Sequence, residues 1–119
     1  MADHNELGIL GEGIARDFLI EKGYRIIERN FRFKKLELDI IAQYGNKIIV
    51  VEVKTRQSSY LTDPRELVSR SKQKGIVKAA NFYIQENQID LDCQFDVIVI
   101  IFNQKRKQIK HIEDAFYAN

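Results

Sequence analysis

The sequence predicts an α/β domain in which a mixed β-sheet of about five strands is flanked by helices, in the order α-β-β-β-α-β-β. This class rests on two amphipathic helical segments and on β-rich runs that precede and follow the second of them. The 119 residues suit a single domain, 1–119, because no repeat, low-complexity tract or linker divides them. A composition of 45% hydrophobic and 30% charged residues is typical of a folded protein rather than a disordered one.

The first predicted helix covers residues 5–22, and Gly23 follows it as a C-cap. Its predicted core residues recur at three- and four-residue intervals: Leu7, Leu10, Ile14 and Phe18. Glu12 lies at the edge of that face, among glycines that each cost a helix about 1 kcal/mol relative to alanine. We therefore expect the glycines to permit close packing or close approach of a substrate. An ordinary exposed helix glutamate is the alternative interpretation of Glu12.

A β-rich segment with one polar face, 24–33, leads through Lys34-Lys35 into a hairpin. The hairpin strands are predicted at 36–44 and 47–54, joined by Gly45-Asn46 as a two-residue type II′ turn. The apolar run at 48–51 predicts that the second of these strands is central and covered on both faces.

Four charged residues converge on this hairpin. Counting from the turn places Asp39 opposite Glu52 and Glu37 opposite Lys54, with the two residues of each strand on one face. Opposed carboxylates ~5 Å apart destabilise a strand pair, and an unpaired carboxylate in a covered strand is costly. Either Lys54 or a divalent cation can offset that cost, and Mg²⁺ prefers such oxygen ligands. The alternative is a strand end that emerges into solvent with an ordinary Glu–Lys pair.

The second half of the chain predicts the remaining elements in order. They are a loop at 55–62, a short helix that begins at Asp63, a longer helix capped by Ser71 and ending near Asn87, a strand at 94–102 and an edge strand at 108–113. The strand at 94–102 should run parallel to the strand that carries Glu52, because a helical crossover normally joins parallel neighbours.

Basic residues are concentrated directly after the acidic patch. Between Lys54 and Lys78 there are seven lysines and arginines and two acidic residues. Such a stretch suits a polyanion whose phosphate is met by a metal, whereas a solvated helix face is the alternative. The residues expected to contact nucleic acid are Arg56, Arg70, Lys72, Lys74 and Lys78.

Other classes of protein are disfavoured by the sequence. No apolar run approaches the ~20 residues that span a membrane, and the first residues lack a signal-peptide pattern, so we expect a cytoplasmic protein with no membrane partner. Cys93 is the single cysteine, which excludes an internal disulfide and a cysteine-rich zinc site. We interpret Cys93 as a packing residue.

The charged residues form a set suited to phosphodiester hydrolysis. Asp39 and Glu52 would hold Mg²⁺ or Mn²⁺, which lowers the pKa of a bound water. Lys54 would orient or deprotonate that water, or stabilise the developing negative charge. Glu12 would reach the metal through water or position Lys54, and Gln73, at the start of a helix, would donate to the attacked phosphate.

Asp39, twelve intervening residues and Glu52-Val53-Lys54 resemble the PD-(D/E)xK nuclease signature. The wider match comprises Gly11-Glu12, Gly23-Tyr24, Glu28-Arg29-Asn30-Phe31-Arg32, Glu37-Leu38-Asp39-Ile40-Ile41-Ala42, Val51-Glu52-Val53-Lys54-Thr55-Arg56, Lys72-Gln73 and Phe95-Asp96-Val97. Together these resemble the small bacterial proteins of the UPF0102 (YraN) family over nearly the full chain. Two residues depart from the patterns: Leu38 stands where the signature has proline, and Leu36 where the family usually has glycine.

This resemblance implies a restriction-endonuclease-like fold, similar to that of archaeal Holliday-junction resolvases. In those enzymes a helical glutamate, an aspartate and a Glu-x-Lys strand form the metal site, which maps here onto Glu12, Asp39, Glu52 and Lys54. The expected function is a Mg²⁺-dependent endonuclease acting on DNA, in particular branched or damaged DNA. A nucleic-acid-binding protein without cleavage activity and an interaction protein that uses the fold alone are the alternatives. Resolvases of this type work as dimers, so a homodimer is a candidate assembly, although no apolar stripe in the sequence specifies one.

Overall fold

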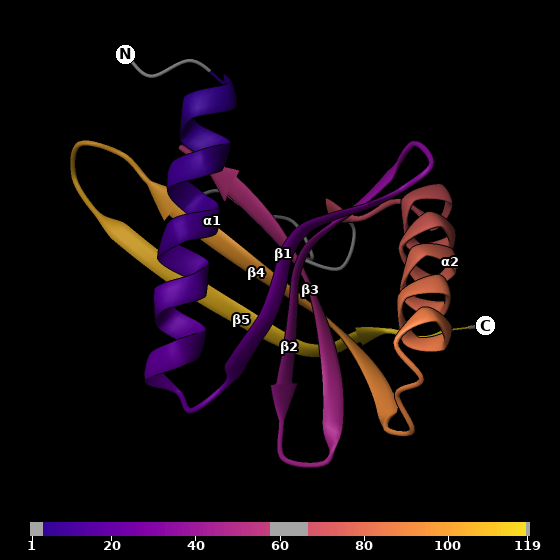
Figure 1. Ribbon diagram of the computed structural model, residues 1–119. Helices are drawn as coiled ribbons and strands as arrows, with labels where there is room; N and C mark the ends of the chain where they lie inside the picture. Colours follow the sequence, from indigo (N-terminus) through magenta and orange to yellow (C-terminus); the bar gives the residue numbers. More distant parts are fainter. Residues whose placement is uncertain (1–3, 58–66, 119) are drawn as a thin grey trace.

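Five strands form one mixed sheet in the order β1-β2-β3-β4-β5, and a helix packs on each face in the computed structural model (Figure 1). The structure describes residues 4–57 and 67–118. The elements are α1 (His4–Glu21), β1 (Arg25–Phe33), β2 (Leu36–Tyr44), β3 (Lys47–Arg56), α2 (Arg70–Glu86), β4 (Asp92–Phe102) and β5 (Lys107–Phe116). Adjacent strands are antiparallel except β3 and β4, which are parallel and joined through α2. The predicted fold class, element order and parallel pair are confirmed.

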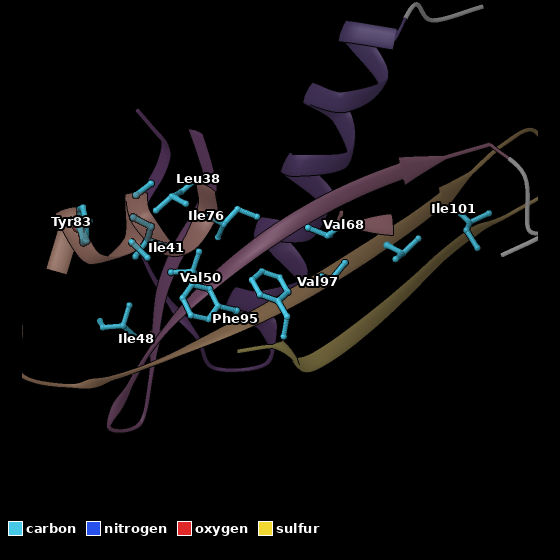
Figure 2. Close-up of a cluster of buried hydrophobic side chains, with 14 residues drawn as sticks. Leu38, Ile41, Ile48, Val50, Val68, Ile76, Tyr83, Phe95, Val97 and Ile101 are labelled. Atoms are coloured by element: carbon cyan, nitrogen blue, oxygen red, sulfur yellow. The ribbon is translucent and has the colours of Figure 1, made fainter. Parts of the chain in front are cut away.

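The two faces of the sheet carry separate hydrophobic clusters. On one face Ala15 and Leu19 of α1 pack with Val51 of β3 and other sheet residues. On the other face Ile76 of α2 belongs to a larger cluster with Leu38 of β2, as Figure 2 shows. Strands β3 and β4 contribute buried residues to both clusters, so the prediction of a central, covered β3 is confirmed.

The buried face of α1 matches the predicted one in part: Ile14 and Phe18 are partly buried and pack against the cluster beneath the helix. It is centred on Gly11, Ala15 and Leu19, all buried, whereas Leu10 is 44% exposed. The prediction followed the large apolar residues, but the small residues allow the helix axis to lie close to the sheet and so define the contact. Its C-terminal end is as predicted: Gly23 has φ +96°, and its N–H donates to the Ile20 carbonyl at 3.0 Å. In the described part of the chain neither helix is long and apolar enough to cross a membrane.

Several element boundaries in the second half of the chain differ from the predicted ones. Ser69, not Ser71, is the N-cap of α2, because its hydroxyl accepts a hydrogen bond from the Lys72 N–H at 3.1 Å. Strand β3 extends to Arg56, beyond the predicted start of the loop, because its parallel pairing with β4 continues to that residue. Strand β5 extends to Phe116. The short helix predicted from Asp63 and most of the predicted 55–62 loop lie outside the described residues.

Strands β2 and β3 pair closely near their turn and then separate. Gly45 has φ +60° and Asn46 is not among the described residues with positive φ, as a type II′ turn requires. The β2–β3 register is the predicted one from Tyr44 and Lys47 to Ile40 and Val51, where the pairing ends. Beyond this point β2 remains paired with β1, and β3 remains paired with β4. The opening between residues 36–39 of β2 and 52–56 of β3 is called the fork.

A local bend in the β1–β2 hairpin opens the fork. Asn30 of β1 has φ +55°, and no pair with Asp39 forms between Arg29–Ile40 and Phe31–Leu38, although the register is the same on both sides. Side-chain alternation also changes here, since Ile40 joins the cluster beneath α1 whereas Leu38 joins the cluster beneath α2. In Figure 1 the hairpin tip accordingly lies beside α2, while β3 leads towards the N-terminal half of α1.

Substituting Gly11 by alanine tests the close contact between α1 and β3. A Cβ at Gly11 would overlap the hydroxyl oxygen of Thr55, so we expect Gly11→Ala to lower the free energy of unfolding by about 1–3 kcal/mol. Gly13→Ala is the matched control, because a Cβ there meets nothing within 4 Å and alanine gains up to about 1 kcal/mol of helix propensity. Urea unfolding of both variants measures the difference. Equal stability of the two variants would contradict the packing.

Candidate functional site

The fork places two carboxylates where β2 leaves β3. The Oδ2 atom of Asp39 accepts a hydrogen bond from the Val53 N–H at 2.8 Å. If the β2–β3 pairing continued, Val53 would face Leu38 and its N–H would donate to a backbone carbonyl of β2. The Asp39 carboxylate takes the place of that acceptor. Glu52 is only 4% exposed, and its Oε2 atom is buried without a hydrogen-bond partner. The side chains of Asp39 and Glu52 interact directly with each other, in agreement with the predicted register.

The electrostatics of this pair reflect its burial. Burial, followed by the interaction with the Glu52 carboxyl group, raises the pKa of Asp39 to about 8. The Val53 N–H and the charge of Lys72 act in the opposite direction. At neutral pH Asp39 therefore retains its proton, even with the charge of Lys72 nearby.

Glu12 faces the same region from α1. Its side chain is partly buried, and burial raises the pKa of Glu12 to about 7. The charges of Asp39 and Glu37 raise this pKa as well, whereas Arg29 lowers it. Glu12 is thus coupled to the carboxylates of the fork, which distinguishes it from an ordinary exposed helix glutamate.

The carboxylate pair has the donor set of a site for a hard divalent cation. Within residues 4–57 and 67–118, no group of three or more His, Cys, Asp or Glu side chains is close enough together to hold a metal ion. Mg²⁺, however, commonly keeps several waters and uses only one or two carboxylates of the protein. The opposed carboxyl groups and the unbonded Glu52 oxygen fit such a cation. Glu12 does not complete a three-carboxylate cluster here, so its contribution would pass through water.

A lysine from α2, rather than Lys54, is the cation found at Glu52. The Nζ atom of Lys72 lies 3.5 Å from Glu52 Oε2. Lys54 follows Glu52 by two residues on β3, which places it on the same face of the strand, and it is partly exposed. The predicted opposition of Glu37 and Lys54 was wrong, because the strands have separated and Glu37 pairs with Arg32 at 3.1 Å.

The other predicted residues are dispersed over α2 and the end of β3. The side-chain amide of Gln73 donates to the Val68 carbonyl at 2.9 Å and so helps to fix the start of α2. Arg56 donates to the Thr55 carbonyl at 2.9 Å. Arg70, Lys74 and Lys78 are exposed on α2. The structure thus brings Lys72 to the carboxylates and gives Gln73 a structural hydrogen bond, a division that their adjacent positions in the sequence did not reveal.

A groove of about 410 Å³ lies between the tip of the β1–β2 hairpin and the start of α2. It is lined by Lys35, Leu36, Glu37, Ser69, Ser71, Lys72, Gly75 and Ile76, and we call it the α2 groove. Leu36 packs against α2: a Cβ at Gly75 would lie 2.8 Å from its Cδ2 atom. Glycine at position 75 thus allows the β1–β2 hairpin to approach α2 closely. Because Lys72 lines the groove and contacts Glu52, the groove adjoins the fork.

A second buried polar cluster lies on the α1 face and was missed from the sequence. Asp96, which is fully buried, accepts a hydrogen bond from His111 Nε2 at 2.7 Å. It also accepts from the side chain of Gln94 and from the Asp114 N–H, both at 3.0 Å. The Nδ1 atom of His111 accepts from Lys22 at 2.8 Å. The Asp96 carboxylate thereby satisfies a β-bulge between β4 and β5, and this cluster is structural.

Cys93 has no reactive character. It is partly buried, and burial, followed by the charge of Asp96, raises the pKa of its thiol to about 12. A thiol in this state is not a nucleophile at neutral pH, consistent with a packing role.

Comparison with known proteins identifies close relatives along the whole chain. The sequence model described as "Uncharacterised protein family UPF0102" matches residues 11–100. A UPF0102 protein of Flavobacterium psychrophilum is 46% identical over 117 residues, covering 98% of both chains. One from Christiangramia forsetii is 44% identical, with the same coverage. One from Chlorobium phaeobacteroides is 42% identical over 124 residues, again covering 98% of each chain.

Comparison with solved structures gives a distant similarity. SfsA of Pyrococcus furiosus, solved in complex with Ca²⁺, matches with a TM-score of 0.36 and 14% identity. The match covers 86% of this chain and 62% of the SfsA chain. At this level the similarity supports no conclusion about activity or ligands.

Proposed function

The chain belongs to the UPF0102 family, and we propose that it is a metal-dependent nuclease that hydrolyses phosphodiester bonds in DNA. The observation that carries this proposal is the carboxylate pair of Asp39, which is partly buried, and Glu52, which is buried, beside a groove with basic residues. Such a pair is costly for stability unless it binds a cation, and a divalent cation beside a basic groove is suited to a phosphate. Branched or damaged DNA is the substrate we expect from the resemblance to resolvases.

In this proposal Asp39 and Glu52 hold Mg²⁺ or Mn²⁺, together with waters. The ion, when bound, polarises the phosphate and lowers the pKa of a bound water. The hydrogen bond from the Val53 N–H fixes the orientation of Asp39, so one carboxylate is preorganised. The raised pKa of Glu12, about 7, allows it to accept and release a proton near neutral pH, through a water between it and the pair.

Lys54 and the basic residues act on the nucleic acid. Lys54 shares the face of Glu52 on β3 and would stabilise the negative charge that develops at the phosphate. Arg70, Lys74 and Lys78 are exposed on α2 and would contact the backbone away from the cleaved bond. Gln73 would act indirectly, by holding Val68 and the start of α2 in place.

A nucleic-acid-binding protein without cleavage activity is the second candidate. It is favoured by the absence of a third carboxylate close to the pair within the described residues. In that case Lys72 would neutralise Glu52 permanently, and binding would weaken steeply with salt whether or not a divalent cation is present.

Cleavage of duplex, junction, flap and RNA substrates with Mg²⁺ or Mn²⁺ tests the proposal. We expect metal-dependent cleavage of DNA by the natural chain and a loss of about 10²–10⁴-fold in Lys54→Ala, with metal binding retained. Lys47→Ala is the matched control: Lys47 is an exposed lysine at the opposite end of the same strand, and cleavage should be unchanged. Salt-sensitive binding without cleavage on any substrate would favour the second candidate, and full activity of Lys54→Ala would contradict the role of Lys54.

A further inference from the structure

The cation beside Glu52 comes from α2, whereas the hairpin register suggested Lys54 of β3 for this role. Glu52 is 4% exposed, and the Nζ atom of Lys72 lies 3.5 Å from its Oε2. This Oε2 atom nevertheless has no hydrogen-bond partner. The lysine therefore compensates the charge of the carboxylate but does not satisfy its hydrogen-bonding capacity, so the contact is electrostatic and loose.

The backbone of Lys72 is fixed, whereas its side chain has room to move. Its N–H donates to the Ser69 hydroxyl in the N-cap, and the next residue, Gln73, donates to the carbonyl of buried Val68. The Lys72 side chain is 50% exposed and lines the α2 groove, which has a volume of about 410 Å³. Its ammonium group can leave Glu52 for the groove without any movement of the helix.

We propose that Lys72 is the resident counter-ion of Glu52 in the metal-free protein, and that a divalent cation displaces it when it binds the carboxylate pair. This inference rests on the proposed metal site. A dipositive ion at Glu52 repels an ammonium group, and the free Oε2 atom gives the ion a ligand that Lys72 has left unbonded. Lys72 thus stabilises the empty site and competes with the metal. Displacement also delivers a positive charge to the α2 groove when the site is loaded.

Titration with MnCl₂ of the natural chain, Lys72→Met, Lys72→Arg and Lys74→Met tests the competition. Isothermal titration calorimetry measures Mn²⁺ affinity, and thermal unfolding without metal measures the stability of the empty site. We expect Lys72→Met to bind Mn²⁺ about tenfold more tightly, the equivalent of 1.4 kcal/mol. The same variant should unfold at a lower temperature than the natural chain when metal is absent. Lys72→Arg keeps the charge and should resemble the natural chain in both measurements.

Lys74→Met removes the same charge from an exposed position of the same helix and should change Mn²⁺ affinity by less than about twofold. If the natural chain binds Mn²⁺ and Lys72→Met binds it equally or more weakly, the displacement is wrong, but the metal site remains. Equal tightening in Lys74→Met would also overturn it, since net charge alone would then explain the effect. If the natural chain binds no Mn²⁺, the proposed metal site itself fails, and the displacement fails with it.

Discussion

Replacing Asp96 by alanine is expected to destabilise the protein by about 3–5 kcal/mol, a large share of the total stability of a domain this size. Asp96 is fully buried and accepts hydrogen bonds from His111, Gln94 and the Asp114 N–H. Alanine would leave all three donors without this acceptor around a fully buried position, and each group left unsatisfied carries its own desolvation cost. Because Asp114 has φ +55° at the bulge, the pairing of β4 and β5 should loosen as well. Thermal unfolding at neutral pH measures the effect.

Two comparisons make this result specific to the Asp96 cluster. Asp90→Ala removes an exposed carboxylate that precedes the same strand and should change stability by less than about 0.5 kcal/mol. His111→Ala combined with Asp96→Ala should cost less than the sum of the two single changes, because both remove the same contact of 2.7 Å. Additive losses, or a loss from Asp96→Ala no larger than that from Asp90→Ala, would contradict a cooperative cluster.

The sheet and the carboxylate pair could be predicted because both depend on short-range patterns. The run 48–51 indicated a covered strand, and the Gly45-Asn46 turn fixed the register that sets Asp39 against Glu52. The burial of small residues was harder to foresee: α1 contacts the sheet through Gly11 and Ala15, which carry little hydrophobic signal. The close approach of the α1 backbone to the sheet, rather than the size of its apolar side chains, determines which face of the helix is buried.

The fork could not be predicted by counting residues from the Gly45-Asn46 turn. An ideal hairpin continues its pairing, whereas here β2 leaves β3 where Asn30 has a positive φ and Leu36 packs against α2. For that reason Glu37 pairs with Arg32 instead of Lys54. The contacts of Lys72 with Glu52 and of His111 with Asp96 likewise join residues far apart in sequence, and no local pattern identifies such partners.

Asp39→Asn is expected to stabilise the metal-free protein while strongly reducing cleavage. Folding raises the pKa of Asp39 from 3.8 to about 8. Between about pH 4 and pH 8 the folded state therefore holds a proton that the unfolded state has released. This contribution to stability is complete below about pH 4 and is lost as the pH rises through about 8. Asparagine does not ionise, and its side-chain oxygen can still accept from the Val53 N–H. Above pH 8 the variant should therefore exceed the natural chain in stability by about 2–5 kcal/mol.

Addition of Mn²⁺ should reduce this advantage of the variant by stabilising the natural chain alone. A metal on the carboxylate pair stabilises the natural chain by about 2.7 kcal/mol at a concentration of 100 times its dissociation constant, and Asp39→Asn should gain little. Cleavage by the variant should fall by about 10³-fold, since a ligand of the ion is lost. Asp17→Asn, which removes an exposed carboxylate on α1, should alter neither property appreciably. Thermal unfolding across pH, with and without Mn²⁺, separates the outcomes. If the variant is less stable than the natural chain at high pH, the Asp39 carboxylate stabilises the fold and the prediction is wrong. Higher stability together with lower cleavage is the result expected of a carboxylate pair that is kept for metal binding at a cost in stability.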